Sequence, residues 1–322
     1  MARKVINNIS SKYIYIILIL LIIFPFNILG INVSIAPSIA LLMGLIFAIL
    51  FLNPYPKFNK KTSKYLLQAS VVGLGFGMNI SESLKSGSEG MTFTIISVVG
   101  VMVLGIIIGY WLHINRKTSY LISAGTAICG GSAIAAVGPI VKAKEEEMAV
   151  SLGVIFILNA IALFIFPTIG HYFELSETQF GTWAAIAIHD TSSVVGAGET
   201  YGPVALQTAT LIKLTRALWI IPLALVTMII FRDKSSKISI PWFIFMFIGA
   251  MIINSYCNLP QHLTSTLVWL SKKGLVLTLF LIGASLSINA IKKVGIKPLI
   301  LAIALWIIIS ASSLIVVIST IN

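Results

Sequence analysis

Charged residues are scarce in this chain: of its 322 residues, 10% are charged and 58% are hydrophobic. A soluble domain carries about 25% charged residues, so the composition excludes an ordinary soluble protein and indicates an integral membrane protein. Cysteine is nearly absent, and Cys129 and Cys257 lie too far apart to form a motif, which excludes a disulfide framework and a zinc site. No phosphate-binding glycine loop and no large soluble segment appear, which excludes an ATP-driven pump. We expect neither a metal nor another cofactor.

Acidic residues are also few, with 10 Asp and Glu against 22 Lys and Arg. The cations lie in short loops between apolar segments, which is the positive-inside pattern of membrane proteins, so we expect no nucleic acid as a partner. With the N-terminus in the cytoplasm, 15 of the 22 cations fall on the cytoplasmic side and the C-terminus lies outside. The first apolar run lacks the small-x-small cleavage site of a signal peptide, so we expect it to remain as the first span.

We interpret nine apolar segments as membrane-spanning helices, for which about 17–25 residues suffice. These segments are 13–29, 36–52, 65–80, 91–111, 148–168, 205–231, 241–256, 274–290 and 299–320. Two further segments, 119–140 and 181–200, are apolar but rich in Gly, Ser and Thr. The sequence therefore predicts an all-α polytopic membrane protein with one transmembrane domain over residues 1–322 and the two irregular segments at its core.

The two irregular segments allow two arrangements. Each is either a re-entrant hairpin or a broken helix that crosses the membrane, which would raise the number of crossings to 11. Residues 127–134 resemble residues 187–194 in their Ala, Ile and Ser positions. Hairpins would enter from opposite faces, as the inverted repeats of secondary transporters require, and would keep Lys142 and Lys144 in the cytoplasm. We favour hairpins, with broken crossing helices as the alternative.

Both irregular segments carry candidate substrate ligands. Non-helical backbone at membrane depth is tolerated only when it is buried in protein or lines a wet cavity. There it offers N–H groups and hydroxyls, and helix N-termini favour anions. The predicted substrate-binding residues of these segments are Gly130, Gly131, Ser132, Thr191, Ser192 and Ser193. The alternative for the first three is that small residues merely allow helices to pack closely.

Lys213 and Arg216 are two cations on one face of an otherwise apolar helix. Each ionisable side chain in hydrocarbon costs at least roughly 2.5–3.5 kcal/mol, so both need a partner or a ligand. We expect them to face a hydrated cavity and to neutralise an anion, since the planar fork of Arg suits oxyanions. The alternative is a structural ion pair, for example between Lys213 and Asp190.

His189 and Asp190 are the candidates for ion coupling. Asp190 could carry a proton or a cation, and a His titrates near neutral pH. The alternative is that Asp190 caps the start of a half-helix. We expect no enzyme, because His189 beside Asp190 in sequence does not make a catalytic triad. For Asn159, in the middle of 148–168, a cross-link between helices is favoured over substrate contact.

Three polar blocks in apolar surroundings carry a family resemblance. Residues 125–134, 187–195 and 213–219 resemble bacterial inner-membrane proteins that bear the name sulfate exporter, and the similarity covers most of the chain. The resemblance implies a multi-pass location in the bacterial inner membrane. It also implies a fold analogy with inverted-repeat secondary transporters, including the citrate, glutamate, bile-acid and sodium/proton exchanger groups. Cys129 falls within the shared motifs, together with the candidate site residues above.

The sequence and the resemblance together predict a secondary transporter that exports a small inorganic or organic anion, such as sulfate or sulfite. The expected partners are this anion, the lipid bilayer and a coupling H+ or Na+, unless the membrane potential alone drives export; a homodimer is left open. The alternative is a cation/proton antiporter in which Asp190 is the ion-binding carboxylate.

Overall fold

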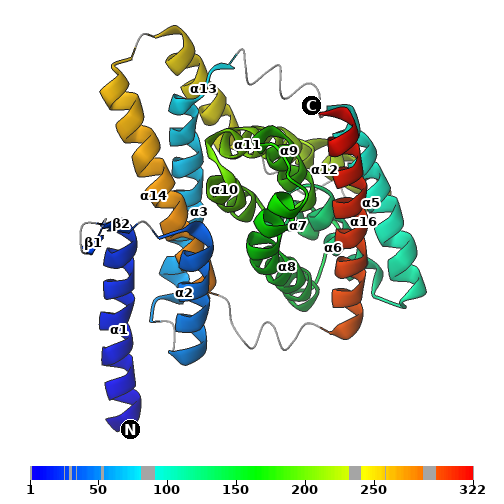
Figure 1. Ribbon diagram of the computed structural model, residues 1–322. Coiled ribbons are helices and arrows are strands. Elements are labelled where there is room, and N and C mark those ends of the chain that lie inside the picture. Colours follow the sequence, from blue (N-terminus) through cyan, green and yellow to red (C-terminus); the bar gives the residue numbers. More distant parts are fainter. Residues whose placement is uncertain are drawn as a thin grey trace. The chain divides into compact units, whose positions relative to one another are not determined.

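The computed structural model describes residues 2–24, 26–28, 31–33, 35–51, 54–80, 91–231, 241–257, 259–285 and 295–321. The chain forms two compact units (Figure 1). The first unit is Met1–Ile80 with Phe243–Ile288, and the second is Ser81–Trp242 with Asn289–Asn322. The single transporter domain stays a prediction, because two compact units can belong to one transporter. The charge pattern also assigned the loop cations at 85, 232–237 and 292–293 to one side of the membrane or the other. These positions lie outside the described residues.

The described elements are nearly all helical. Those of the first unit are α1 (Ala2–Ile23), α2 (Pro37–Leu50), α3 (Pro56–Leu74), the 3-10 turn η1 (Gly75–Gly77), α13 (Trp242–Tyr256) and α14 (Gln261–Ser285). A small antiparallel pair, β1 (Phe26–Ile28) and β2 (Ile31–Val33), follows α1. Those of the second unit are α5 (Met91–Trp111), α6 (Arg116–Ala127), α7 (Gly131–Ile140), α8 (Glu145–Tyr172), α9 (Glu177–Ala187), α10 (Thr191–Tyr201), α11 (Pro203–Ala217), α12 (Ile220–Phe231) and α16 (Ile296–Thr320).

Five helices within the described ranges are long and apolar enough to cross a membrane: 94–111, 145–172, 203–231, 261–285 and 296–320. The prediction of an all-α membrane protein is confirmed in this form, and the further spans stay predictions. Several boundaries differ from the sequence interpretation. The helix predicted at 13–29 ends at Ile23, and residues 26–28 form a strand. The helix predicted at 65–80 begins at Pro56, because proline suits the first turn of a helix. The helix predicted at 274–290 begins at Gln261, because polar residues extend it beyond its apolar part.

In the first unit, α14 packs against α2 and α3. The backbones of α2 and α14 approach closely at two glycines. A Cβ on Gly44 would overlap the carbonyl oxygen of Phe280, and a Cβ on Gly283 would overlap that of Leu41. Small residues that let backbones meet are the usual basis of helix packing in membranes.

The substitution Gly44→Ala is expected to destabilise the first unit by about 1–3 kcal/mol, the usual range for overpacking, because the new methyl group meets backbone that cannot rotate away. The measurement is thermal unfolding of the purified protein in detergent. Gly249→Ala on α13 is the matched control, since a Cβ there has nothing within 4 Å. Equal unfolding temperatures for the two variants would contradict the close contact.

The second unit contains two helical hairpins. In the first hairpin (α6 and α7), Lys117 Nζ donates to the carbonyl oxygen of Lys142 at 2.7 Å, so the start of α6 lies beside the end of α7. In the second hairpin (α9 and α10), the Tyr201 hydroxyl donates to the carbonyl oxygen of Leu175 at 2.6 Å, so the start of α9 lies beside the end of α10. Both segments therefore fold back as helical hairpins, and their re-entry into the membrane stays a prediction.

The contacts of the first hairpin with helix α8 show the direction in which this hairpin runs. It has 28 residues, a length of about 42 Å at 1.5 Å per residue. Gly138, near the base of the first hairpin, contacts Met148 near the start of α8. Gly130, at the tip of that hairpin, faces Ile155 nearer the middle. The first hairpin therefore runs from the N-terminal end of α8 towards its centre.

The second hairpin runs along α8 in the opposite sense. Phe180, near its base, contacts Gly170 near the end of α8. Its tip binds the middle of α8, where Asn159 Oδ1 accepts the backbone N–H groups of His189 and Asp190. The two hairpins thus approach from opposite ends of α8 and their tips meet halfway. Inverted repeats require this relation, and it supports the predicted repeat, which remains a prediction.

The bases of the two hairpins differ in charge. The base of the first, here called the basic end, carries Arg116, Lys117, Lys142 and Lys144, with Glu145–Glu147 at the start of α8. The base of the second, here called the acidic end, carries Glu174 and Glu177. Glu177 Oε2 accepts the backbone N–H groups of Val204 and Ala205 and so caps the start of α11.

Candidate functional site

The two hairpin tips, 128–130 and 188–190, form the candidate site, here called the junction. Helix α6 ends at Ala127 and α7 begins at Gly131. Gly130 has a φ of 63°, in the left-handed region that favours glycine, which explains why the chain breaks there. A Cβ on Gly130 would lie 3.3 Å from the Cβ of Asp190. The tips are therefore in direct contact.

Asp190 caps the second arm of the second hairpin. Its Oδ1 accepts the backbone N–H of Ser193 at 2.9 Å, and its Oδ2 accepts the Ser192 hydroxyl at 2.7 Å. This is the geometry of an N-cap carboxylate at the start of α10. The capping alternative thus describes the contacts of Asp190, while its partly exposed side chain leaves a coupling role as a proposal.

The two cations cap the first arms of the hairpins. Lys213 Nζ donates to the carbonyl oxygens of Ala185 and Ile188, at 3.2 and 2.6 Å. Arg216 donates from Nε and Nη2 to the carbonyl oxygen of Ala127, at 2.9 and 2.6 Å. The last carbonyls of a helix lack partners within the helix and carry partial negative charge, so a cation stabilises them. Lys213 thus binds the end of α9, and Arg216 binds the end of α6.

This arrangement differs from the expectation of two cations in a hydrated cavity. Both side chains are 0% exposed, and among the described residues they bind carbonyl oxygens rather than Asp190 or another carboxylate. The physical reason is that a broken helix leaves buried carbonyls unpaired, and the cations then satisfy them. Since α11 carries both cations, one helix holds both tips.

The charges at the junction leave it electropositive. Lys213 and Arg216 contribute two positive charges and Asp190 one negative charge. With roughly half a charge at each helix end, the two C-termini of α6 and α9 cancel the two N-termini of α7 and α10, which leaves about one net positive charge.

The junction also gathers buried polar groups that lack partners. Four buried side-chain nitrogens without a hydrogen bond occur in the part of the chain that the structure describes. They belong to His189 at a tip and to two residues that bind a tip or the helix end beside it: Asn159 Nδ2, His189 Nδ1 and Nε2, and Arg216 Nη1. The hydroxyl of Thr126, beside Ala127, also lacks a partner. Leaving a buried polar group unpaired costs about 1–3 kcal/mol. These unpaired polar groups make the junction the candidate binding site.

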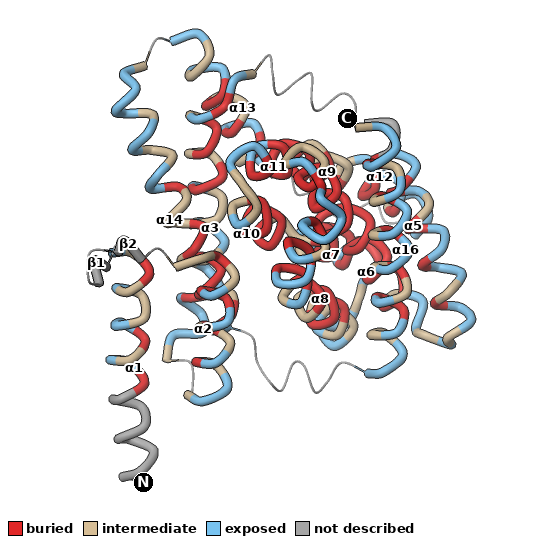
Figure 2. The backbone as a smooth tube through the Cα atoms, viewed as in Figure 1, coloured by how far each residue is buried: buried red, intermediate tan, exposed pale blue. Residues whose placement is uncertain are grey.

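The sequence-predicted site residues lie in the two tips, in the first turns of α7 and α10, or on α11. Gly130, Ser192, Ser193 and the two cations are buried, whereas Ser132 is exposed. Gly131, Asp190 and Thr191 are partly exposed, so one edge of the junction is accessible, while most of both hairpins is buried (Figure 2). Cys129 is buried beside them.

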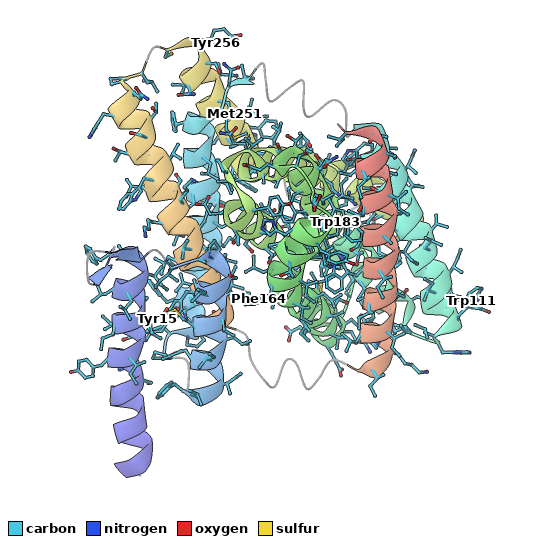
Figure 3. All side chains as sticks on the ribbon, in the orientation of Figure 1. Tyr15, Trp111, Phe164, Trp183, Met251 and Tyr256 are labelled. Carbon is cyan, nitrogen blue, oxygen red and sulfur yellow. The ribbon has the colours of Figure 1, made fainter. Side chains whose placement is uncertain are left out.

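Sequence reasoning did not single out the aromatic side chains that flank the second hairpin. Trp183, labelled in Figure 3, stacks on Phe166 with ring centroids 4.4 Å apart, and its Nε1 donates to the carbonyl oxygen of Ser310 on α16. The Trp306 ring lies 6.5 Å from that of His189. These rings pack α16 against the second hairpin and shield its tip. Scattered tryptophans in an apolar chain gave no signal of this.

No group of three His, Cys, Asp or Glu side chains within the described residues could hold a metal ion.

Comparison with known proteins gives a consistent class. A family model described as conserved hypothetical protein 698 matches residues 14–302. A UPF0324 membrane protein of Bacteroides thetaiotaomicron is 62% identical over 283 residues, which cover 87% of this chain and 86% of that protein. Similar proteins of Porphyromonas gingivalis and Vibrio parahaemolyticus are 59% and 46% identical, over 86% and 87% of this chain and 86% and 92% of their own. No solved structure matches the chain.

Proposed function

This chain belongs to the conserved hypothetical protein 698 family of membrane proteins, and we propose that it is a secondary transporter of a small anion, with sulfate and sulfite as the first candidates. One observation carries the proposal: two hairpin tips meet beside two buried cations and beside buried side-chain nitrogens that have no hydrogen-bond partner. Half-helix ends and unused N–H groups at membrane depth are what secondary transporters use to bind anionic substrates.

In the proposed mechanism, the anion enters at the accessible edge of the junction. The backbone at Gly131 and the hydroxyls of Ser132 and Thr191 lie at this edge and receive it first. Lys213 and Arg216 supply the positive field while they hold the ends of α9 and α6. Because the buried donors are reached only when the tips separate, movement of a hairpin would release the anion to one side or the other.

The charge of the hairpin bases supports an orientation. Under the positive-inside rule, which counts Lys and Arg and gives little weight to acids, the basic end faces the cytoplasm. The first hairpin then enters from the cytoplasm and the second from outside. An inside-negative potential of about 100 mV favours export by roughly 2.3 kcal/mol per negative charge. Export of a dianion therefore needs no further driving force than the membrane potential.

Purified protein in proteoliposomes tests this function. We expect labelled sulfate or sulfite to leave loaded vesicles faster than from protein-free vesicles, and an imposed inside-negative potential to accelerate the efflux. Carboxylates of similar size, added as competitors, define the anion class. Sodium or proton exchange that proceeds without any anion, together with no anion efflux, would overturn the proposal in favour of a cation/proton antiporter.

A further inference from the structure

Asn159 has a fixed orientation at the midpoint of α8. Its Oδ1 accepts two backbone N–H groups at the tip of the second hairpin, from His189 at 3.1 Å and Asp190 at 3.3 Å. Two N–H donors need an acceptor, and the oxygen is the acceptor of an amide. The amide orientation is therefore fixed, with Oδ1 towards the tip and Nδ2 on the other side. That nitrogen is buried, in a side chain that is 3% exposed, and has no hydrogen-bond partner.

Arg216 offers a second fixed donor at the same junction. Its Nε and Nη2 are held by the carbonyl oxygen of Ala127, which fixes the guanidinium plane and leaves Nη1 without a partner. Asn159 and Arg216 come from different helices, and each is bonded to a different hairpin tip. Each free donor thus comes from a side chain that is anchored to one hairpin, Asn159 on α8 to the second and Arg216 on α11 to the first.

We propose that Asn159 is the specificity-determining contact of the anion site and that its Nδ2 donates to one oxygen of a small oxyanion held at the junction. This rests on the proposed function and deepens it by assigning the residue that distinguishes an oxyanion from other ions. An oxyanion has several acceptor oxygens, so donors fixed in different directions can each bind their own oxygen. A halide offers one acceptor centre, and a cation offers none to an N–H group.

The same amide also connects the ligand to the hairpins. Oδ1 binds the second hairpin tip while Nδ2 binds the oxyanion. A ligand that holds Nδ2 therefore steadies the amide that holds the tip. The tip is thus positioned best when the correct oxyanion is bound.

The substitution Asn159→Asp tests this contact with little change of shape. The carboxylate keeps an acceptor for both backbone N–H groups but replaces the outward donor by an oxygen. We expect apparent affinity for labelled sulfate to fall at least about tenfold, because an oxyanion then meets an acceptor in place of a donor. Asn115→Asp is the matched control, since Asn115 is exposed and its Oδ1 caps α6 by accepting the Lys117 N–H. It should leave sulfate affinity unchanged.

Wild-type sulfate affinity in folded Asn159→Asp would overturn this inference while leaving the proposed function intact. Absence of anion flux in the wild type would instead defeat the proposed function. If Asn159→Asp does not fold, selenate bound to crystals of the wild type decides, because selenium is located by its anomalous scattering. Selenate within hydrogen-bond reach of Asn159 Nδ2 supports the contact, and selenate bound elsewhere overturns it.

Discussion

Replacing Arg216 by Gln is expected to reduce anion flux at least about 100-fold. The guanidinium makes two hydrogen bonds to the end of α6 and supplies one of the two positive charges at the junction. Hydrogen bonds to a charged group contribute about 1.5–3 kcal/mol each. Loss of about 2.7 kcal/mol of that interaction already corresponds to a factor of 100. The measurement is sulfate efflux from proteoliposomes with matched amounts of folded protein.

Two further variants separate charge from geometry. Arg116→Gln makes the same change at the exposed start of α6 and should leave efflux near the wild-type rate. Arg216→Lys keeps the charge but has no planar fork, so it cannot reproduce two bonds to one carbonyl together with a free donor. We expect it to recover only part of the flux. Near wild-type flux in Arg216→Gln would show that the guanidinium takes no part in transport.

The breaks in the two hairpins could be predicted from sequence because local chemistry sets them. Gly130 adopts a backbone conformation that other residues avoid, and Asp190 is a capping residue placed before two serines. These features are local, so they are visible in a single sequence. The same holds for the long apolar helices, whose composition alone indicates a membrane.

The choice between a hairpin and a crossing helix could not be predicted as clearly from the sequence. Hairpins and crossing helices leave the other loops unchanged, so the charge pattern barely separates them. The contacts that separate them join residues far apart in the chain, such as Lys117 with Lys142 and Tyr201 with Leu175. Neither pair has a sequence signature, because a backbone carbonyl can accept from any donor that reaches it.

The hydrogen-bond partners of the two cations could not be predicted either, because they too are backbone carbonyls. Spacing placed Lys213 and Arg216 on one helix face, and both do act on one region. Their acceptors are backbone carbonyls at the ends of α6 and α9, which carry no side-chain identity to recognise. Asn159 was interpreted as a helix cross-link, which is correct for Oδ1 but omits Nδ2. Its position at the midpoint of the long α8 segment is the sequence feature that could have indicated a role for Nδ2.

The substitution Asp190→Asn is expected to separate an anion transporter from a cation/proton antiporter. Asparagine is as good an N-cap as aspartate, so Oδ1 can still accept the Ser193 N–H and α10 should keep its start. Loss of the negative charge makes the junction more favourable for an anion. Sulfate efflux without ion gradients should therefore stay within a few-fold of wild type, whereas any acceleration by a proton or sodium gradient should disappear.

An antiporter that binds its cation at Asp190 would behave in the opposite way, because the neutral amide removes the ion-binding group and cation exchange should cease. Asp190→Ala distinguishes the charge from the cap. It removes both, costs about 1 kcal/mol of helix stability, and should lower the unfolding temperature as well as the flux. If Asp190→Asn and Asp190→Ala were equally inactive while only Asp190→Asn unfolded like the wild type, the carboxylate charge itself would be essential and the antiporter would be the better description.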